Sequence, residues 1–206
     1  MASEISIKMP LVRVARFRHG ESCANAGSAT TDPASIQLTE KGKRQACTIG
    51  ELAANPPSII ICSPYLRAKE TAAPTLRRFP STPWEIWPIQ EFTYLAQDRC
   101  AGTSPAQRRP WVENYWQLAT PDLLDGPGAE SSGEFIGRVR NALDCMTSFY
   151  SERDFTMTIF GHGQFFQAMR WLIENRPPTI DSYAMPSFRQ IDLDPCISRI
   201  RCSKFV

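Results

Sequence analysis

The stretch LVRVARFRHG, residues 11–20, decides the fold class of this chain. A β-branched and aromatic run that stops at a glycine is typical of a buried strand ending in a tight turn. The chain's only other histidine, His162, stands in a second such stretch, FTMTIFGHG at residues 155–163. In open α/β sheets, ligands bind beyond the carboxyl ends of parallel strands. The two stretches therefore predict that His19 and His162 meet at one edge of a parallel sheet.

The first histidine has an arginine beside it, because Arg18 directly precedes His19. An imidazole nitrogen can attack phosphorus, and a guanidinium group binds phosphate oxygens through two parallel hydrogen bonds. The pair therefore favours phosphoryl chemistry. The alternative at this point is that two unrelated histidines merely end strands.

A third short apolar run, IIIC at residues 59–62, stops at Ser63 and Pro64. Serine is a favoured N-cap and proline a favoured first helical residue, so we expect a helix to begin directly at the end of this strand. Arg67 would lie one turn into that helix and could point back at the strand end, although a lone helical arginine is usually solvated. This arrangement would bring a second arginine and free backbone amides to the same edge.

A fourth run, WEIWPIQ at residues 84–90, leads into Glu91. Cleavage of a phosphate ester needs a proton for the leaving oxygen, and a semi-buried carboxylic acid with a raised pKa can supply it. Taken alone, a glutamate after a strand is more often a surface charge. Glu91 leads the candidates for this acid because it follows a strand directly. The competitors are Asp98, Glu113, Asp125 and Glu130.

Four motifs follow one another along the chain: RHGES at residues 18–22 with Asn25, LTEKGKRQA at 38–46, SPYLRA at 63–68 and GHG at 161–163. Together they resemble the histidine phosphatase superfamily, the phosphoglycerate mutase-like family, in which these blocks occur in this order. The resemblance covers most of the chain. An RHG tripeptide alone is a weak signal, whereas four ordered motifs at strand-to-loop junctions are a strong one.

The resemblance implies that His19 is the nucleophile and forms a phosphohistidine intermediate. It implies that Glu91 donates a proton to the leaving oxygen and later activates water as a base. The other members of the phosphate pocket implied in this way are Arg18, Asn25, Arg67 and His162. For His19 to attack, its second ring nitrogen must donate a hydrogen bond, and we expect a backbone carbonyl near Gly20 to accept it.

We expect this reaction to need no metal and no cofactor. Two arginines and a second histidine can neutralise the charge that Mg²⁺ neutralises in other phosphoryl transfers. With two histidines and no Cys-x-x-Cys pair, the chain also offers no convincing metal site. One departure from the family pattern is Arg16, which stands where the first strand is normally apolar. We expect Arg16 to pair with a carboxylate at the sheet edge; a contact with an anionic substrate is the alternative.

The order of strand and helix signals predicts a single domain, residues 1–206, with an α/β fold. We expect three layers, α/β/α, around a mostly parallel central sheet, similar to the phosphoglycerate mutase-like fold. Thr39 is a predicted N-cap, and Ser131 with Glu134 forms a predicted capping box. The expected helices span residues 39–54, 131–150 and 163–175, and a strand pair from residue 191 onward closes the chain.

The segment over residues 96–130 is the least regular part of the sequence. A long decorated loop at a sheet edge often forms a lid or a substrate wall, so we expect this segment to set specificity, around one short helix. Arg108 and Arg109 could hold a second anionic group of the substrate. Solvated charge is the alternative for both.

Composition excludes several classes of partner. The net charge is +2 over 206 residues and the basic residues are scattered, so we expect no nucleic-acid or membrane surface. No apolar run approaches the length of a membrane span, and the N-terminus lacks a signal-peptide stretch. Seven cysteines without a framework pattern suit a reducing compartment, which favours a cytoplasmic location. The oligomeric state stays open.

Three functions compete. The first is a metal-independent phosphatase that hydrolyses a small phosphomonoester through His19 and releases inorganic phosphate. The second is a cofactor-dependent phosphoglycerate mutase with the same intermediate, for which the chain looks short. The third is a non-catalytic protein that binds phosphorylated ligands, which is disfavoured because every group that the chemistry needs is present. We therefore expect a phosphatase, whose substrate a fold-level likeness does not identify.

Overall fold

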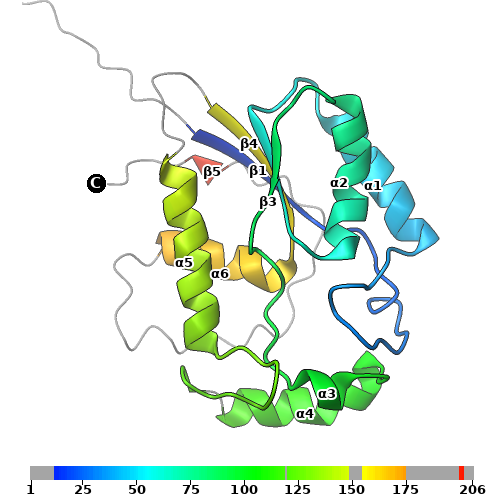
Figure 1. Ribbon diagram of the computed structural model, residues 1–206, viewed down its shortest axis with the longest axis vertical. Coiled ribbons are helices and arrows are strands. Elements are labelled where there is room, and N and C mark those ends of the chain that lie inside the picture. Colours follow the sequence, from blue (N-terminus) through cyan, green and yellow to red (C-terminus); the bar gives the residue numbers. More distant parts are fainter. Residues whose placement is uncertain (1–11, 119, 149–154, 175–199, 202–206) are drawn as a thin grey trace, which may run out of the picture.

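The structure, a computed structural model, describes residues 12–118, 120–148, 155–174 and 200–201 (Figure 1). In chain order the elements are β1 (Val12–Arg18), α1 (Glu40–Leu52), β2 (Ile59–Cys62), α2 (Leu66–Arg78), β3 (Trp84–Ile86), α3 (Gln97–Cys100), α4 (Pro105–Leu118), α5 (Ser132–Ser148), β4 (Phe155–Gly161), α6 (Gly163–Glu174) and β5 (Ile200–Arg201). Strands alternate with helices along most of this order, so the predicted α/β class is confirmed.

The sheet has the strand order β3-β2-β4-β1-β5. Strands β1 to β4 run parallel, and β5 pairs antiparallel with β1, so the predicted mostly parallel sheet is confirmed. In the pairing of β1 with β4, Arg18 lies opposite Gly161. His19 and His162 therefore leave neighbouring strands at the same edge, and the backbone N–H of His19 donates to the carbonyl of Gly161 at 3.0 Å.

Helices cover both faces of the sheet, which makes the three predicted layers. All four residues of β2 are buried, as expected for a strand covered on both sides. Ile59 and Ile61 pack into a core with residues of α5 and α6, whereas Ile60 and Cys62 pack against α1 and α2. Figure 1 shows the sheet between these two pairs of helices.

The capping signals of the sequence are confirmed. The Thr39 hydroxyl oxygen accepts a hydrogen bond from the N–H of Gly42 at 3.1 Å, at the start of α1. Ser131 and Glu134 form a reciprocal capping box: the Ser131 N–H donates to the Glu134 carboxylate at 2.8 Å, and the Glu134 N–H donates to the Ser131 hydroxyl at 3.2 Å. These side chains satisfy helix N–H groups that would otherwise lack partners.

The predicted start of α2 at Ser63 and Pro64 is wrong. The helix begins at Leu66, with Tyr65 at the N-cap. The Ser63 hydroxyl instead lies 2.8 Å from Nε2 of His162, and it accepts a hydrogen bond from the Tyr65 N–H at 3.2 Å. A contact made across 99 residues thus overrides the local capping preference.

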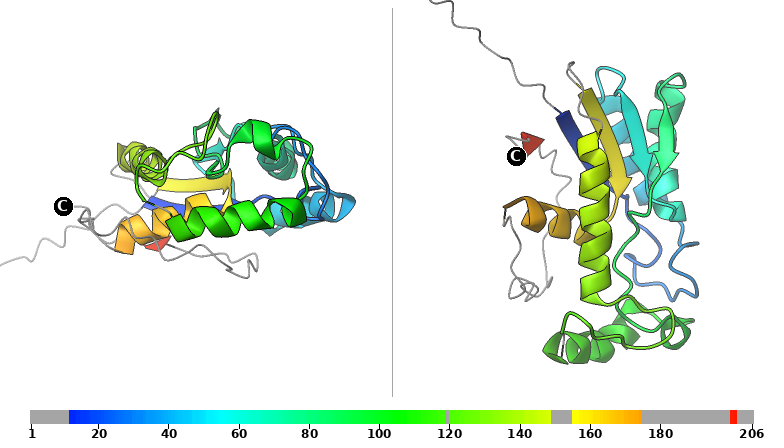
Figure 2. Two further views of the ribbon diagram at one scale, coloured as in Figure 1. Left: turned by 90° about the horizontal axis from the view of Figure 1, so that it is seen from below. Right: turned by 60° about the vertical axis from the view of Figure 1, so that its left-hand side comes forward.

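Three further expectations need correction or lie partly outside the described residues. The fourth strand ends at Ile86 instead of near residue 90, because β3 is a short, exposed edge strand. The segment over residues 96–130 holds two helices, α3 and α4, and Figure 2 shows them beyond the end of α5. Of the closing strand pair, only β5 is described, and residues 191–199 lie outside the described part. None of the described helices is both long enough and apolar enough to cross a membrane.

Candidate active site

His19 is buried, 8% exposed, directly after the end of β1. Its Nδ1 lies 2.7 Å from the carbonyl of Gly20, and Nε of Arg67 donates to its Nε2 at 3.1 Å. A guanidinium group only donates, so Nε2 must be the unprotonated nitrogen and Nδ1 must carry the hydrogen. Gly20 is therefore the expected carbonyl partner that fixes the tautomer, and the lone pair of Nε2 is available for chemistry.

The electrostatics of the site keep His19 neutral. Burial, first of all, and then the charges of Arg67 and Arg18 lower its pKa from 6.5 to about 3, although the hydrogen bond to Gly20 opposes this. A buried imidazole beside two cations gains nothing from taking up a proton. His19 is thus an uncharged base at any pH near neutrality, and its Nε2 lone pair accepts the hydrogen bond from Arg67.

Arg67 holds α2 against the loop that carries His19. It is the second residue of α2 and is buried, 6% exposed. Its guanidinium group donates to the carbonyl of Pro33 at 2.6 Å and lies 4.9 Å from the centre of the Tyr65 ring. Its own carbonyl accepts from the Thr71 hydroxyl at 2.6 Å, and that hydroxyl accepts from the N–H of Gly20 at 3.0 Å. Backbone and side chain of Arg67 are therefore both fixed relative to His19.

Two glycines let the loop after β1 lie directly on the first turn of α1. A Cβ atom on Gly20 would come within 2.5 Å of the Gly42 carbonyl oxygen, and one on Gly42 would come within 2.1 Å of the Glu21 carbonyl oxygen. Real Cβ atoms do not approach backbone oxygens so closely. Glycine is thus needed in both the RHG motif and the LTEKG motif for the same reason: the two backbones pack too closely for a Cβ atom, and this packing positions His19.

His162 is fully buried beside the first histidine, with ring centres 5.2 Å apart. The Ser63 hydroxyl accepts from the Tyr65 N–H at 3.2 Å and lies 2.8 Å from Nε2 of His162, where either group can be the donor. Burial, and then the charges of Arg67 and other groups, lower the pKa of His162 well below its usual value. The second imidazole is therefore also neutral.

Two buried nitrogen atoms of the site have no hydrogen-bond partner among the described residues: Nδ1 of His162 and Nε of Arg18, of which the arginine nitrogen always carries a hydrogen. Buried donors without partners are rare, because each costs about 1–3 kcal/mol. Here both belong to a site that also holds the guanidinium of Arg67. A buried guanidinium donor without an acceptor, next to a second guanidinium group, is what an anion-binding site presents to its ligand.

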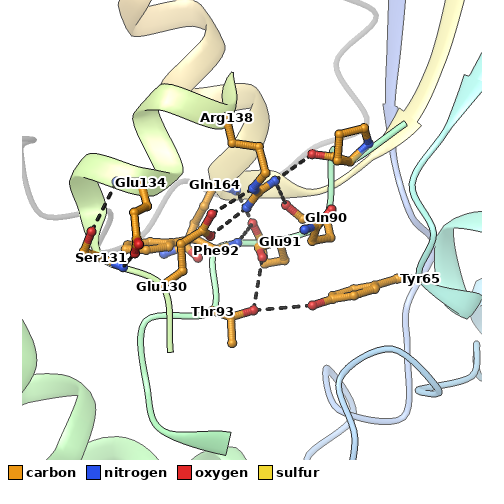
Figure 3. Close-up of polar contacts among 11 residues, drawn as sticks. Tyr65, Gln90, Glu91, Phe92, Thr93, Glu130, Ser131, Glu134, Arg138 and Gln164 are labelled. Carbon is orange, nitrogen blue, oxygen red and sulfur yellow. Dashed lines mark hydrogen bonds and ion pairs between the residues drawn. The ribbon is translucent and has the colours of Figure 1, made fainter. Parts of the chain in front are cut away.

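Glu91 follows β3 and reaches the start of α6. Its Oε1 accepts from the backbone N–H of Phe92 at 3.3 Å and of Gln164 at 3.1 Å (Figure 3). Burial of the carboxyl group raises its pKa, while Arg67 and Arg18 oppose the shift. The carboxyl group is therefore a better proton carrier than a surface glutamate. The backbone amide of Gln164, at the start of α6, therefore already has an acceptor in Glu91.

Arg138 holds the chain directly before Glu91, and no sequence signal pointed to it. Its Nε and one terminal nitrogen bind both carboxylate oxygens of Glu130, at 2.8 and 2.7 Å. The other terminal nitrogen donates to the carbonyls of Pro88 and Gln90, at 3.0 Å each (Figure 3). The residues just before Glu91 are thus fixed to α5, from 48 to 50 positions away in sequence.

Asn25 is not brought into contact with the histidines. It is exposed, and its Oδ1 accepts from the N–H and the hydroxyl of Ser22, at 3.1 and 2.8 Å. Within the described residues it shapes the loop after His19. A role in binding substrate stays a prediction.

Each competitor for the acid has another partner. Asp98 caps the N–H of Arg99, Glu113 pairs with Arg109, and Glu130 pairs with Arg138. Asp125 pairs with Arg99 and accepts from the N–H of Ala96. All four are thus held in contacts of the 96–130 segment and α5, whereas the charge of Glu91 raises the pKa of both site arginines, Arg18 and Arg67, against the effect of their burial.

The arginines whose roles the sequence left open also have defined contacts. The Arg108 guanidinium donates through Nε and one terminal nitrogen to three residues, Thr30, Cys100 and Thr103, and a role in holding an anion stays a prediction. Arg109 is exposed and pairs with Glu113. Arg16 donates to the carbonyl of Phe166 at 3.3 Å. Its expected carboxylate partner stays a prediction.

Within the described part of the chain, no three histidine, cysteine, aspartate or glutamate side chains gather as metal ligands would. The candidate site is instead a cluster of two neutral imidazoles, two guanidinium groups and one carboxyl group. With the carboxyl group protonated, the two guanidinium groups give this cluster a charge of +2, which suits an anion of charge −2.

Comparison with known proteins agrees with this geometry. No curated protein matches the sequence. Among solved structures, "Mycobacterial hydrolase 1" has a TM-score of 0.65 at 23% identity, over 84% of this chain and 82% of its own. A mycobacterial glucosyl-3-phosphoglycerate phosphatase complexed with VO3 has a TM-score of 0.63 at 22% identity, over 85% and 86%. The α-ribazole phosphatase of Shigella flexneri has a TM-score of 0.65 at 20% identity, over 83% of each chain.

These likenesses show the fold. The family is shown by the sequence itself, because the model of the family described as "Histidine phosphatase superfamily (branch 1)" matches residues 16–194. That match spans the end of β1, β2 to β4, the helices α1 to α6 and both histidines. The chain therefore belongs to the histidine phosphatase superfamily.

Proposed function

We propose that this protein is a metal-independent phosphatase that hydrolyses a small phosphomonoester through a phosphohistidine on His19. The observation that carries the proposal is the buried, unpartnered Nε–H of Arg18 and the unpartnered Nδ1 of His162 beside a neutral His19. With both imidazoles uncharged, the two arginines give the site a charge of +2. A phosphomonoester dianion balances that charge and supplies the missing acceptors.

In the first step, Nε2 of His19 attacks phosphorus. Arg67 must move its Nε–H from Nε2 to a phosphate oxygen, which frees the lone pair at the moment when substrate is bound. The P–O bond to the alcohol breaks as the N–P bond forms, and Glu91 gives its proton to the leaving oxygen. The ring becomes cationic, and its Nδ1–H bond to the Gly20 carbonyl stabilises that charge.

In the second step, Glu91, now ionised, takes a proton from water. The hydroxide oxygen attacks phosphorus, the N–P bond breaks, and the electron pair returns to Nε2 of His19. Inorganic phosphate leaves and Glu91 is protonated again, so that every group is restored. Arg18, Arg67 and His162 hold the three peripheral oxygens through both steps. Asn25 is proposed as an additional donor from the adjoining loop.

The test is release of phosphate by the purified protein, with chelator present, from an aryl phosphate and from alkyl phosphates. His19→Ala is expected to abolish release while the far-UV circular dichroism and the melting temperature stay close to those of the wild type. Acid-labile, alkali-stable label from a ³²P-substrate should appear in the wild type only. Retained turnover in His19→Ala would remove His19 as the nucleophile, and transfer only between phosphoglycerates with a bisphosphate primer would assign a mutase instead.

A further inference from the structure

A large cavity adjoins the candidate site. It has a volume of about 1140 Å³ and is bounded by α5, the chain on both sides of Glu91 and the loop around Pro33. Tyr65 is a shared wall, because it lines the cavity while its ring lies edge-on to His162, with centres 5.3 Å apart. Neither histidine lines the cavity. The phosphoryl group and the rest of a substrate would therefore occupy separate, adjoining spaces.

The charges around this cavity are acidic. The charged side chains among its described lining residues are Asp32, Glu130, Glu134 and Arg138. Arg138 is neutralised, because Glu130 binds it with both carboxylate oxygens and two carbonyls take its remaining donor. The uncompensated charges are those of Asp32 and Glu134, so the cavity has a net charge of −2. This is opposite in sign to the phosphate site next to it.

The uncharged lining fits a hydroxyl-bearing molecule. Thr93, Gln97 and Asn141 supply hydrogen-bonding groups, and Tyr65 and Trp87 supply aromatic surface. Pockets for small ligands are typically about 300–1,000 Å³ and mix apolar walls with a few polar groups in this way. The volume exceeds what a three-carbon alcohol would fill.

We propose that this cavity receives the alcohol part of the substrate and selects an uncharged polyhydroxy alcohol, larger than three carbons, over one that carries a carboxylate. The inference rests on the proposed function and deepens it. Proposed with it is a role for the segment over residues 96–130 in specificity, because Gln97 and Glu130 come from that segment. A carboxylate in this space would face two like charges and no free cation, whereas hydroxyl groups would find donors and acceptors.

The test uses pairs of substrates that differ only in the charge of the alcohol. Sorbitol 6-phosphate and 6-phosphogluconate share a six-carbon chain and differ at one end, CH₂OH against carboxylate. The wild type is expected to show a kcat/KM about tenfold higher for sorbitol 6-phosphate at low salt, the size of effect that two partly screened charges produce at this range. Glycerol 3-phosphate, which leaves most of the cavity empty, should be a poorer substrate than sorbitol 6-phosphate.

The double variant Asp32→Asn/Glu134→Gln removes the two charges and keeps their hydrogen bonds. Oδ1 of Asn can still accept from the Ala34 N–H, and Gln can still complete the capping box with Ser131. The preference should fall to about twofold or less in this variant. The matched control is Glu40→Gln/Glu51→Gln on α1, which lines no part of the cavity and should keep the wild-type preference.

The outcomes separate the two proposals. A wild type that hydrolyses an aryl phosphate through His19 but prefers 6-phosphogluconate would overturn the inference and leave the phosphatase function intact. A preference that survives unchanged in the double variant would overturn its electrostatic basis. Absence of hydrolysis of every ester, the aryl phosphate included, would refute the proposed function, and the inference would fall with it.

Discussion

The neutrality of His19 leads to a sharp prediction, because the pKa of its imidazole is lowered from 6.5 to about 3. Between these two values the unfolded chain binds a proton that the folded protein does not. The sign follows: folding stability falls as the pH falls through this range. From pH 7 to pH 5, the shift corresponds to a loss of about 2 kcal/mol in the free energy of unfolding.

The perturbation is His19→Gln, which removes the titrating group. The free energy of unfolding is measured in urea for wild type and variant at pH 7 and at pH 5. Whatever the substitution costs at pH 7, the difference between the two proteins should change by about 2 kcal/mol in favour of the variant at pH 5. The carboxylates that titrate in this range are the same in both proteins, so their contributions to the free energy of unfolding cancel in this comparison.

A direct readout exists because the chain holds only two histidines. Their two Cε1–H signals in an NMR titration should stay at neutral-imidazole positions down to pH 5. Inorganic phosphate should raise the pKa of His19, because its charge offsets Arg67 and Arg18. A signal that titrates near pH 6.5 in the folded, phosphate-free protein, or a stability difference independent of pH, would refute the reasoning.

Three other substitutions test the neighbouring contacts. Glu91→Gln should slow the hydrolysis of alkyl phosphates by about a hundredfold and that of aryl phosphates far less, since aryl leaving groups need little protonation; equal loss on both would move the acid elsewhere. Arg138→Met should lower the free energy of unfolding, measured in urea, by about 3 kcal/mol, as expected for breaking a mostly buried ion pair. A loss no larger than that of Arg170→Met, which breaks an exposed pair, would contradict the proposed role of Arg138 in fixing the chain before Glu91. Gly42→Ala should lower the melting temperature, because its Cβ would meet the Glu21 carbonyl oxygen. Alanine is normally more stable than glycine in a helix by about 1 kcal/mol, so a rise in the melting temperature would show that the loop can shift.

The parts of the fold that depend on local signals could be predicted from the sequence. The strands that end at His19 and His162, the Thr39 cap and the Ser131 capping box are each specified by neighbouring residues. The start of α2 could not, because Ser63 is held by His162. A local preference of about 1 kcal/mol gives way to such a contact.

The contacts around Glu91 also could not be predicted from the sequence. Arg138 binds two backbone carbonyls, and no residue type marks a carbonyl as the partner of a distant arginine. Arg108 shows the same limit, because its three partners lie in two loops that only the folded chain brings together. Motifs therefore predicted the groups of the candidate site, whereas the contacts that hold them in place became visible only in three dimensions.

The hydrogen bond from Arg67 to Nε2 of His19 also affects how the protein without substrate reacts with other reagents. The most nucleophilic atom of the site is covered by a cation until something anionic draws that cation away. Uncharged electrophiles, such as acylating agents, find the lone pair occupied, whereas a phosphate ester uncovers it by its own arrival. For the proposed nucleophile, the same guanidinium thus limits modification by uncharged reagents until an anion binds and draws it away.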